Sequence, residues 1–252
     1  QGGTQAAQGI AIGSGIQANE GAWAKGDQSI AIGANTIASG DSSVVIGGDD
    51  LDKVAASNAT YTKKTFDKNG NQTGTTTVTK NLNQLFGDLT GRGAILNANT
   101  TIDGVQYSRW KGTEAEQGAV ALGVKAVSGD IALAIGTMSE ARGINSVAIG
   151  TGAQTPQANA VAIGGGSTTN GIQGRQITDA DIALSDGTTM TFTNFAGAAN
   201  VEEGSMVSFG RLGKERQLKN IAPGEVTATS TDGINGSQLF AVAKKLGDDI
   251  SK

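Results

Sequence analysis

The sequence predicts an all-β protein made of short strands stacked in register, and three observations support this. Glycine supplies 39 of the 252 residues, while aromatic residues make up only 4%. A short apolar phrase that ends in glycine recurs along the chain, and its usual spacing is 14 residues. A chain with so few large side chains cannot build a thick core, whereas a thin repetitive stack needs none because each layer covers the next.

The repeated phrases define the unit of the stack. Val, Ile or Leu alternates with Ala in every phrase except SVVIG, which is the period of a β-strand. A second set of glycines, such as Gly129 and Gly143, lies seven residues before the glycines that end the phrases. Each unit therefore has two turns and two short strands. The phrases are GIAIG (9–13), SIAIG (29–33), SVVIG (43–47), AVALG (119–123), ALAIG (132–136), SVAIG (146–150) and AVAIG (160–164).

The apolar pairs predict which faces of the stack are buried from water. Neither face of a phrase such as SVAIG is polar, so we expect both faces to be buried and Val147 and Ile149 to be core residues. A coil of 14 residues cannot enclose a core by itself. We therefore expect identical chains to associate laterally, most simply around a cyclic axis.

A long insertion interrupts the repeat over residues 48–117. Its pattern predicts a helix starting within 49–54, a hairpin with strands at 61–66 and 74–79, and a helix over 80–89. Basic residues outnumber acidic residues in the predicted hairpin. Two interpretations stay open: a hairpin packed on a neighbouring subunit, or a receptor-binding arm displayed outward. For the second, the candidate ligand contacts are Tyr61, Lys63, Lys64 and Lys68.

Composition excludes several classes of function. The chain has no Cys and no His, which removes thiol nucleophiles, imidazole bases and ordinary zinc sites. We expect no enzyme activity, and no catalytic, cofactor-binding or metal-binding residues. A net charge of −4 gives no reason to expect a nucleic-acid partner. No apolar run approaches the ~18 residues of a membrane span, so any membrane anchor is expected outside this fragment.

Residues 207–239 read VSFGRLGKERQLKNIAPGEVTATSTDGINGSQL. This stretch resembles the neck of trimeric autotransporter adhesins, the YadA-like surface proteins of Gram-negative bacteria, and the SVAIG-type phrases resemble the head of the same family. The resemblance implies a trimeric left-handed parallel β-roll, a neck and a coiled-coil stalk. From Leu239, apolar residues step by 4, 3 and 4, which predicts the seam of a short trimeric coiled coil. The seam residues are Leu239, Ala243, Leu246 and Ile250.

The repeat and the resemblance together divide the chain into six segments. Residues 166–206 lack the repeat, suggest short strands around a turn at 186–187, and match a β-prism-like module of the family in length and position. The expected segments are a β-roll head (1–47), the inserted arm (48–117), the rest of the head (118–165), the β-prism-like connector (166–206), the neck (207–238) and the start of the stalk (239–252).

The expected function is adhesion from the bacterial cell surface, on the extracellular side of the outer membrane. The resemblance implies a homotrimer that binds host extracellular matrix (collagen, fibronectin or laminin) or a host cell-surface receptor. Asn145 and Ser146 begin a phrase that resembles the repeat tied to collagen binding in some heads, and they are further candidate ligand contacts. The alternative is a trimerisation spacer whose binding site lies elsewhere. A β-solenoid enzyme is disfavoured because the repeats carry almost no ionisable residues.

Overall fold

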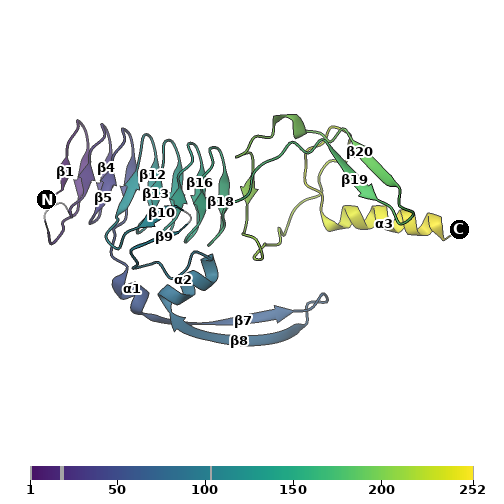
Figure 1. Ribbon diagram of the computed structural model, residues 1–252, viewed down its shortest axis with the longest axis horizontal. Coiled ribbons are helices and arrows are strands. Elements are labelled where there is room, and N and C mark those ends of the chain that lie inside the picture. The colour runs from purple at the N-terminus through teal and green to yellow at the C-terminus, as the bar shows by residue number, and fades with distance from the viewer. Residues whose placement is uncertain (1, 18–19, 103, 252) are drawn as a thin grey trace. The chain divides into compact units, whose positions relative to one another are not determined.

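Two parallel sheets of very short strands form the main body of the structure, a computed structural model that describes residues 2–17, 20–102 and 104–251 (Figure 1). Each coil of the chain gives one strand to each sheet. The eight-stranded sheet contains β2 (Ile10–Ile12), β4 (Ile30–Ile32), β6 (Val44–Ile46), β12 (Val120–Leu122), β14 (Leu133–Ile135), β16 (Val147–Ile149), β18 (Val161–Ile163) and β21 (Val207–Ser208). The seven-stranded sheet contains β1 (Gly3–Thr4), β3 (Trp23–Ala24), β5 (Thr36–Ala38), β11 (Thr113–Ala115), β13 (Val127–Ser128), β15 (Glu140–Ala141) and β17 (Gln154–Thr155).

The register of the sheets follows the sequence repeat. Val147 pairs with Leu133 on one side and with Val161 on the other, each 14 residues away. Like residues therefore stack on like residues along the whole sheet. The structure is mostly β with a few helices, as the sequence led us to expect in outline, and its parallel sheets fit a β-roll.

Small side chains fill the interior of the roll. The central alanine of most phrases, such as Ala134 or Ala148, is fully buried between the two sheets. Val147 and Ile149 are only half-buried and lie on the outer face of the sheet. The prediction that these two residues are core is therefore wrong for the single chain. The strand period explains the outcome, because alternate side chains point to opposite faces and the central residue of each strand, alanine in most strands and Val45 in β6, is the one that faces inward.

Glycine ends each phrase because the coils approach too closely there for any side chain. Gly150 has a φ of 129°, and a Cβ on this residue would lie 2.5 Å from the carbonyl carbon of Gly164 on the next coil. Both the backbone conformation and the missing space require glycine. The position is repeated at Gly136, whose Cβ would meet Gly150 at 2.7 Å.

The insertion forms two helices, a long hairpin and a short hairpin. The expected helix–hairpin–helix order is confirmed. The roll resumes earlier than residue 118, because β11 within the expected insertion already pairs with β5. The elements are α1 (Asp52–Ala56), β7 (Asn58–Phe66), β8 (Gln72–Asn81), α2 (Leu82–Thr90), β9 (Thr100–Ile102) and β10 (Val105–Tyr107).

Residues 173–205 and 215–252 form a second unit. Its antiparallel hairpin has the expected turn at Asp186-Gly187, and its helix starts three residues before Leu239. Asn235 caps this helix, and Gln238 bonds back to the backbone of Gly224 and Asn235, so residues of the neck motif fix the helix start. The elements are β19 (Asp179–Ala183), β20 (Thr189–Thr193), η1 (Ala198–Asn200) and α3 (Gly236–Ile250).

Candidate functional site

The insertion is anchored on one turn edge of the roll by an apolar cluster. Met138, which lies in a left-handed turn of the roll, is 2% exposed and belongs to this cluster. Thr90 at the end of α2 packs beside Gly152 and Gly166, which occupy the same turn position on the next two coils. The insertion therefore covers several successive coils. The cluster comprises Leu51, Ala55, Phe86, Ile95, Leu96, Tyr107 and Met138.

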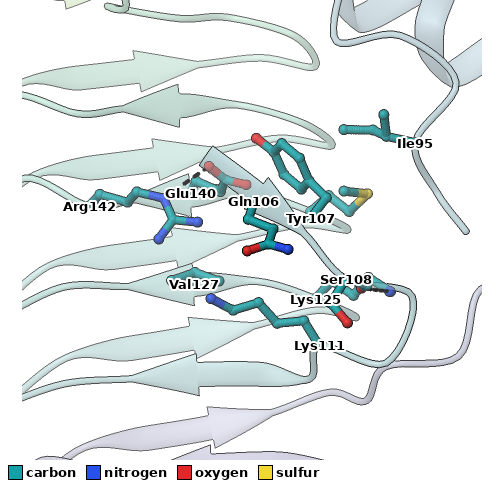
Figure 2. A pocket seen from close by; sticks show the side chains of 10 residues that line it. Ile95, Gln106, Tyr107, Ser108, Lys111, Lys125, Val127, Glu140 and Arg142 are labelled. Carbon is teal, nitrogen blue, oxygen red and sulfur yellow. Dashed lines mark hydrogen bonds and ion pairs between the residues drawn. The ribbon is translucent and has the colours of Figure 1, made fainter. Parts of the chain in front are cut away.

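A buried ion pair ties the insertion to the roll. Arg92 of the insertion and Glu140 of β15 are 6% and 4% exposed, and Arg92 Nη2 lies 2.7 Å from Glu140 Oε1. Arg92 Nη1 also donates to the backbone oxygen of Met138 at 2.6 Å, and its Nη2 donates to the Tyr107 hydroxyl. The second carboxylate oxygen of Glu140 accepts from Arg142 Nε at 3.1 Å. Figure 2 shows Glu140 between Tyr107 and Arg142 on the outer side of the seven-stranded sheet.

The electrostatics of this cluster favour the charged pair. Burial opposes ionisation of Glu140, but the attraction of Arg92 and Arg142 outweighs it and holds the pKa of Glu140 below its ordinary value. Burial also raises the pKa of the Tyr107 phenol, which stays a neutral hydrogen-bond partner. A charged pair in this position fixes the insertion to the roll in one arrangement.

The pocket beside the ion pair is too small for a substrate. Its volume is about 10 Å³, which corresponds to a single water molecule. Lys111, Lys125 and Arg142 line it together with Tyr107 (Figure 2). Ligand pockets are typically at least about 300 Å³. No group of three or more acidic side chains that could hold a metal ion occurs among the described residues. The cluster is therefore a structural anchor.

The long hairpin β7–β8 extends from α1 and α2 (Figure 1). From here on, the word arm refers to this hairpin alone and not to the whole insertion. Nine antiparallel residue pairs join its strands, from Asn58 with Asn81 to Phe66 with Gln72. The structure brings four of the predicted contact residues together here: Tyr61, Lys63 and Lys64 on β7 and Lys68 in the turn, all exposed. Whether they contact a ligand remains a prediction.

The other two predicted contact residues lie on the opposite turn edge of the roll and differ from each other. Asn145 is exposed, has a φ of 56°, and donates from Nδ2 to Asn159 Oδ1 at 2.8 Å. Ser146 is fully buried, and its hydroxyl meets the Thr155 hydroxyl at 3.0 Å inside the roll. Ser146 is therefore a structural residue and not an accessible contact. A buried Ser recurs at this position in other coils, as at Ser29 and Ser43.

The predicted seam residues all lie on α3. They are exposed in the single chain, with Leu239 at 62%, Leu246 at 57% and Ile250 at 85%. Lys244 pairs with Asp248 at 2.8 Å, away from the seam, and Lys245 pairs with Asp249. The helix is present, and its assembly into a coiled coil through Leu239, Ala243, Leu246 and Ile250 remains a prediction.

A continuous apolar face covers the outside of the eight-stranded sheet. Its two parallel rows come from the first and last residues of each strand, as in Val147–Val161 and Ile149–Ile163. These side chains are half-buried or exposed, with Ile12 at 59% and Ile46 at 44%. We expected one face of the stack to need cover, and this apolar face is the exposed side of the eight-stranded sheet in the single chain. Its cover by other chains remains a prediction.

Two stretches of the roll match the family model of the YadA head domain repeat, residues 24–49 and 128–153. These stretches contain the alanine-centred strands and glycine turns described above. These two stretches of the roll are therefore similar to the YadA head domain repeat. A curated relative, the autotransporter adhesin BtaE of Brucella suis biovar 1 (strain 1330), is 38% identical over 63 residues. That match covers 25% of this chain and 8% of the relative, so the chain spans a small part of the relative's length.

Two solved structures are similar to this chain. The collagen-binding domain of the Yersinia adhesin YadA aligns over 94% of this chain and 98% of that domain, with 20% identity and a TM-score of 0.43. A C-terminal YadA-like domain from Burkholderia pseudomallei aligns over 75% of this chain and 68% of that domain, with 26% identity and a TM-score of 0.32. Within the described residues, no helix has the length and apolar character needed to cross a membrane.

Proposed function

We propose that the chain is the homotrimeric head of a bacterial cell-surface adhesin that attaches to host extracellular matrix or to a host receptor. The observation that carries the proposal is the bare apolar face of the eight-stranded sheet. Contiguous apolar surface of this extent on a soluble protein marks an interaction site. The same residue types recur on every coil, so the face runs the length of the roll and suits a second copy in the same register.

The energetics favour assembly through this face. Burying a half-exposed Val or Ile side chain contributes roughly 1 kcal/mol. Strands β4, β6, β12, β14, β16 and β18 each present two aliphatic side chains of this kind, which are Val or Ile except for Leu122 and Leu133. Three rolls that turn these faces to a common axis would remove all of them from water. A closed cyclic trimer also leaves no apolar face to recruit further copies.

A charged substitution on the apolar face tests the assembly. In Ile135→Asp, three carboxylates would meet near the axis, and we expect the native mass to fall from that of a trimer to that of a monomer. Val54→Asp changes an apolar side chain on α1 that is 44% exposed, and it serves as the matched control. An Ile135→Asp protein that keeps the trimer mass contradicts assembly through this face.

The adhesive role follows from the surfaces that such a trimer leaves open. The arm and the turn edge with Asn145 are presented three times around the axis, so weak contacts gain avidity. We expect the chain to bind at least one member of a panel of immobilised collagen, fibronectin, laminin and host cells. A variant in which a two-residue turn replaces residues 58–81 separates the arm from the rest of the head. Failure to bind every member of the panel favours the alternative, a trimerisation spacer.

A further inference from the structure

The arm is a basic element in an acidic protein. Residues 58–81 hold four lysines and one aspartate, for a net charge of +3. The whole chain has a net charge of −4, so the remaining residues carry −7. An isolated positive element on a negative protein concentrates attraction for anions at one place.

Three of the four lysines are available to a ligand. Lys63, Lys64 and Lys68 are exposed, and none of them takes part in an ion pair within the described part of the chain. Lys80, by contrast, pairs with Asp88 at 2.7 Å. The strand residues Lys63 and Lys64 lie opposite Thr76 and Thr75, and Lys68 lies in the turn.

The aspartate of the arm, Asp67, accepts hydrogen bonds within the turn. Asp67 Oδ1 accepts from the backbone of Asn69 at 2.8 Å and of Asn71 at 2.9 Å, and its Oδ2 accepts from Asn71 Nδ2 at 3.0 Å. Its acceptor capacity is therefore used by the residues that shape the turn. The lysines around it are left without a local anionic partner.

Most side chains on the face of the arm that carries Lys64 are polar, although strand alternation places Phe66, which is 59% exposed, on the same face. Alternate residues of a strand share a face, so the cross-strand pairs place Lys64 together with a row of threonines. Thr60 and Thr79 hydrogen-bond each other at 2.8 Å across the strands. The threonines of this face are Thr60, Thr62, Thr75, Thr77 and Thr79. At about 3.3 Å per residue, the ribbon spans roughly 30 Å.

We propose that the arm binds a linear sulfated polysaccharide. Lysine ammonium groups attract sulfate and carboxylate groups, and the threonine hydroxyls can bond to sugar hydroxyls and sulfate oxygens. Lys63 and Lys64 point to opposite faces, which suits a flexible polymer that wraps around the ribbon. A protein partner would need an apolar centre to its interface, and a membrane would need an apolar face to insert. On the face with Lys64, threonines outnumber the one apolar side chain, that of Phe66.

The ligand class predicts a specific salt dependence. Binding to a dense linear polyanion releases condensed counterions, so affinity falls steeply as salt rises. With about 0.7 ions released per neutralised charge, removal of three lysines reduces the slope of log K against log salt by about two. This inference extends the proposed surface role, but its test reads polysaccharide binding directly and does not depend on the matrix-protein panel.

The experiment compares two triple variants of the whole chain. Lys63→Gln/Lys64→Gln/Lys68→Gln removes the free lysines of the arm. Lys25→Gln/Lys53→Gln/Lys219→Gln removes the same number of charges from other exposed positions and is the matched control. The probes are a heparin fragment of defined length and the same fragment after desulfation, with the affinity measured at several salt concentrations. Native mass and the thermal midpoint verify that both variants fold and assemble as the parent does.

We expect the arm variant to bind heparin at least tenfold more weakly than the parent, with the smaller salt slope, and the control to stay within about twofold. Desulfated heparin should bind weakly to all three proteins. Equal affinity of the arm variant and the parent for heparin would overturn the proposal. So would equal binding of sulfated and desulfated fragments, or lysine-dependent binding to phosphatidylserine vesicles without binding to heparin. A parent that forms trimers but fails on the matrix panel leaves this result unaffected.

Discussion

Glu140→Gln should release the insertion from the roll while leaving the roll folded. The change removes the carboxylate charge that faces Arg92, but it keeps the size of the side chain. Arg92 is only 6% exposed, so its guanidinium would remain buried without a counter-charge. Breaking one partner of such a buried pair costs about 3–5 kcal/mol. The lower figure applies here, because Arg92 keeps its bonds to the backbone of Met138 and to the Tyr107 hydroxyl.

Hydrogen exchange of the insertion measures this effect locally. A cost of about 3 kcal/mol corresponds to roughly a hundredfold faster opening, at 1.36 kcal/mol per tenfold. Amides of α2 and of residues 93–98 should exchange about a hundredfold faster, while amides of β14 and β16 should keep their rates. Asp88→Asn removes the exposed partner of Lys80 and is the control, for which we expect no measurable change.

A double variant separates the ion pair from other effects of the substitution. Arg92→Met with Glu140→Gln removes both charges, so no uncompensated charge remains, and we expect most of the protection to return. The reasoning is refuted if Glu140→Gln alone changes the exchange of α2 by less than tenfold. It is also refuted if the free-energy change of the double variant, calculated from its exchange rate, equals the sum of the changes measured for Arg92→Met alone and Glu140→Gln alone.

Three further predictions concern pH, packing and the stalk helix. Because the folded pKa of Glu140 is lowered, its contribution is present above the ordinary Glu value of about 4.3 and is lost as pH falls through the lower folded value, so exchange of α2 should rise, relative to its unprotected rate, as the solution is acidified through that range. Gly150→Ala puts a Cβ 2.5 Å from the backbone of Gly164 at a positive φ, and the midpoint of urea unfolding should drop by an amount equivalent to about 2 kcal/mol or more. Asn235→Ala removes the capping box of α3 and should lower the helical signal of a peptide spanning 230–252, a loss of about 1 kcal/mol.

The repeated parts of the fold could be predicted because their causes are local. The glycine turns and the alternation within each phrase depend on residues that are adjacent in the sequence. The arm was predictable for the same reason, since Asp67 to Asn71 form a turn between two alternating segments. The boundary at residue 118 was not, because the strand Thr113–Ala115 reads TEA and lacks the glycine-ended apolar phrase.

The parts that were missed depend on contacts that the sequence does not display. Arg92 and Glu140 are 48 residues apart, and a single glutamate in a repeat gives no sign that a distant arginine covers it. Ser146 was proposed as a contact because it begins a phrase that resembles the repeat tied to collagen binding. In the structure its side chain is fully buried, whereas that of the next residue, Val147, lies on the outer face of the sheet. Both faces of SVAIG look apolar on paper, and only the spacing of the two sheets decides that alanine faces in.

The native mass of the intact chain in solution tests the central claim most directly. The chain has a mass of 25.2 kDa, and three copies that share the apolar faces of their eight-stranded sheets give three times that value. We expect a single species near three times the chain mass at micromolar concentration, and its dissociation by Ile135→Asp. A stable species at 25.2 kDa with the apolar face open to water would contradict the account.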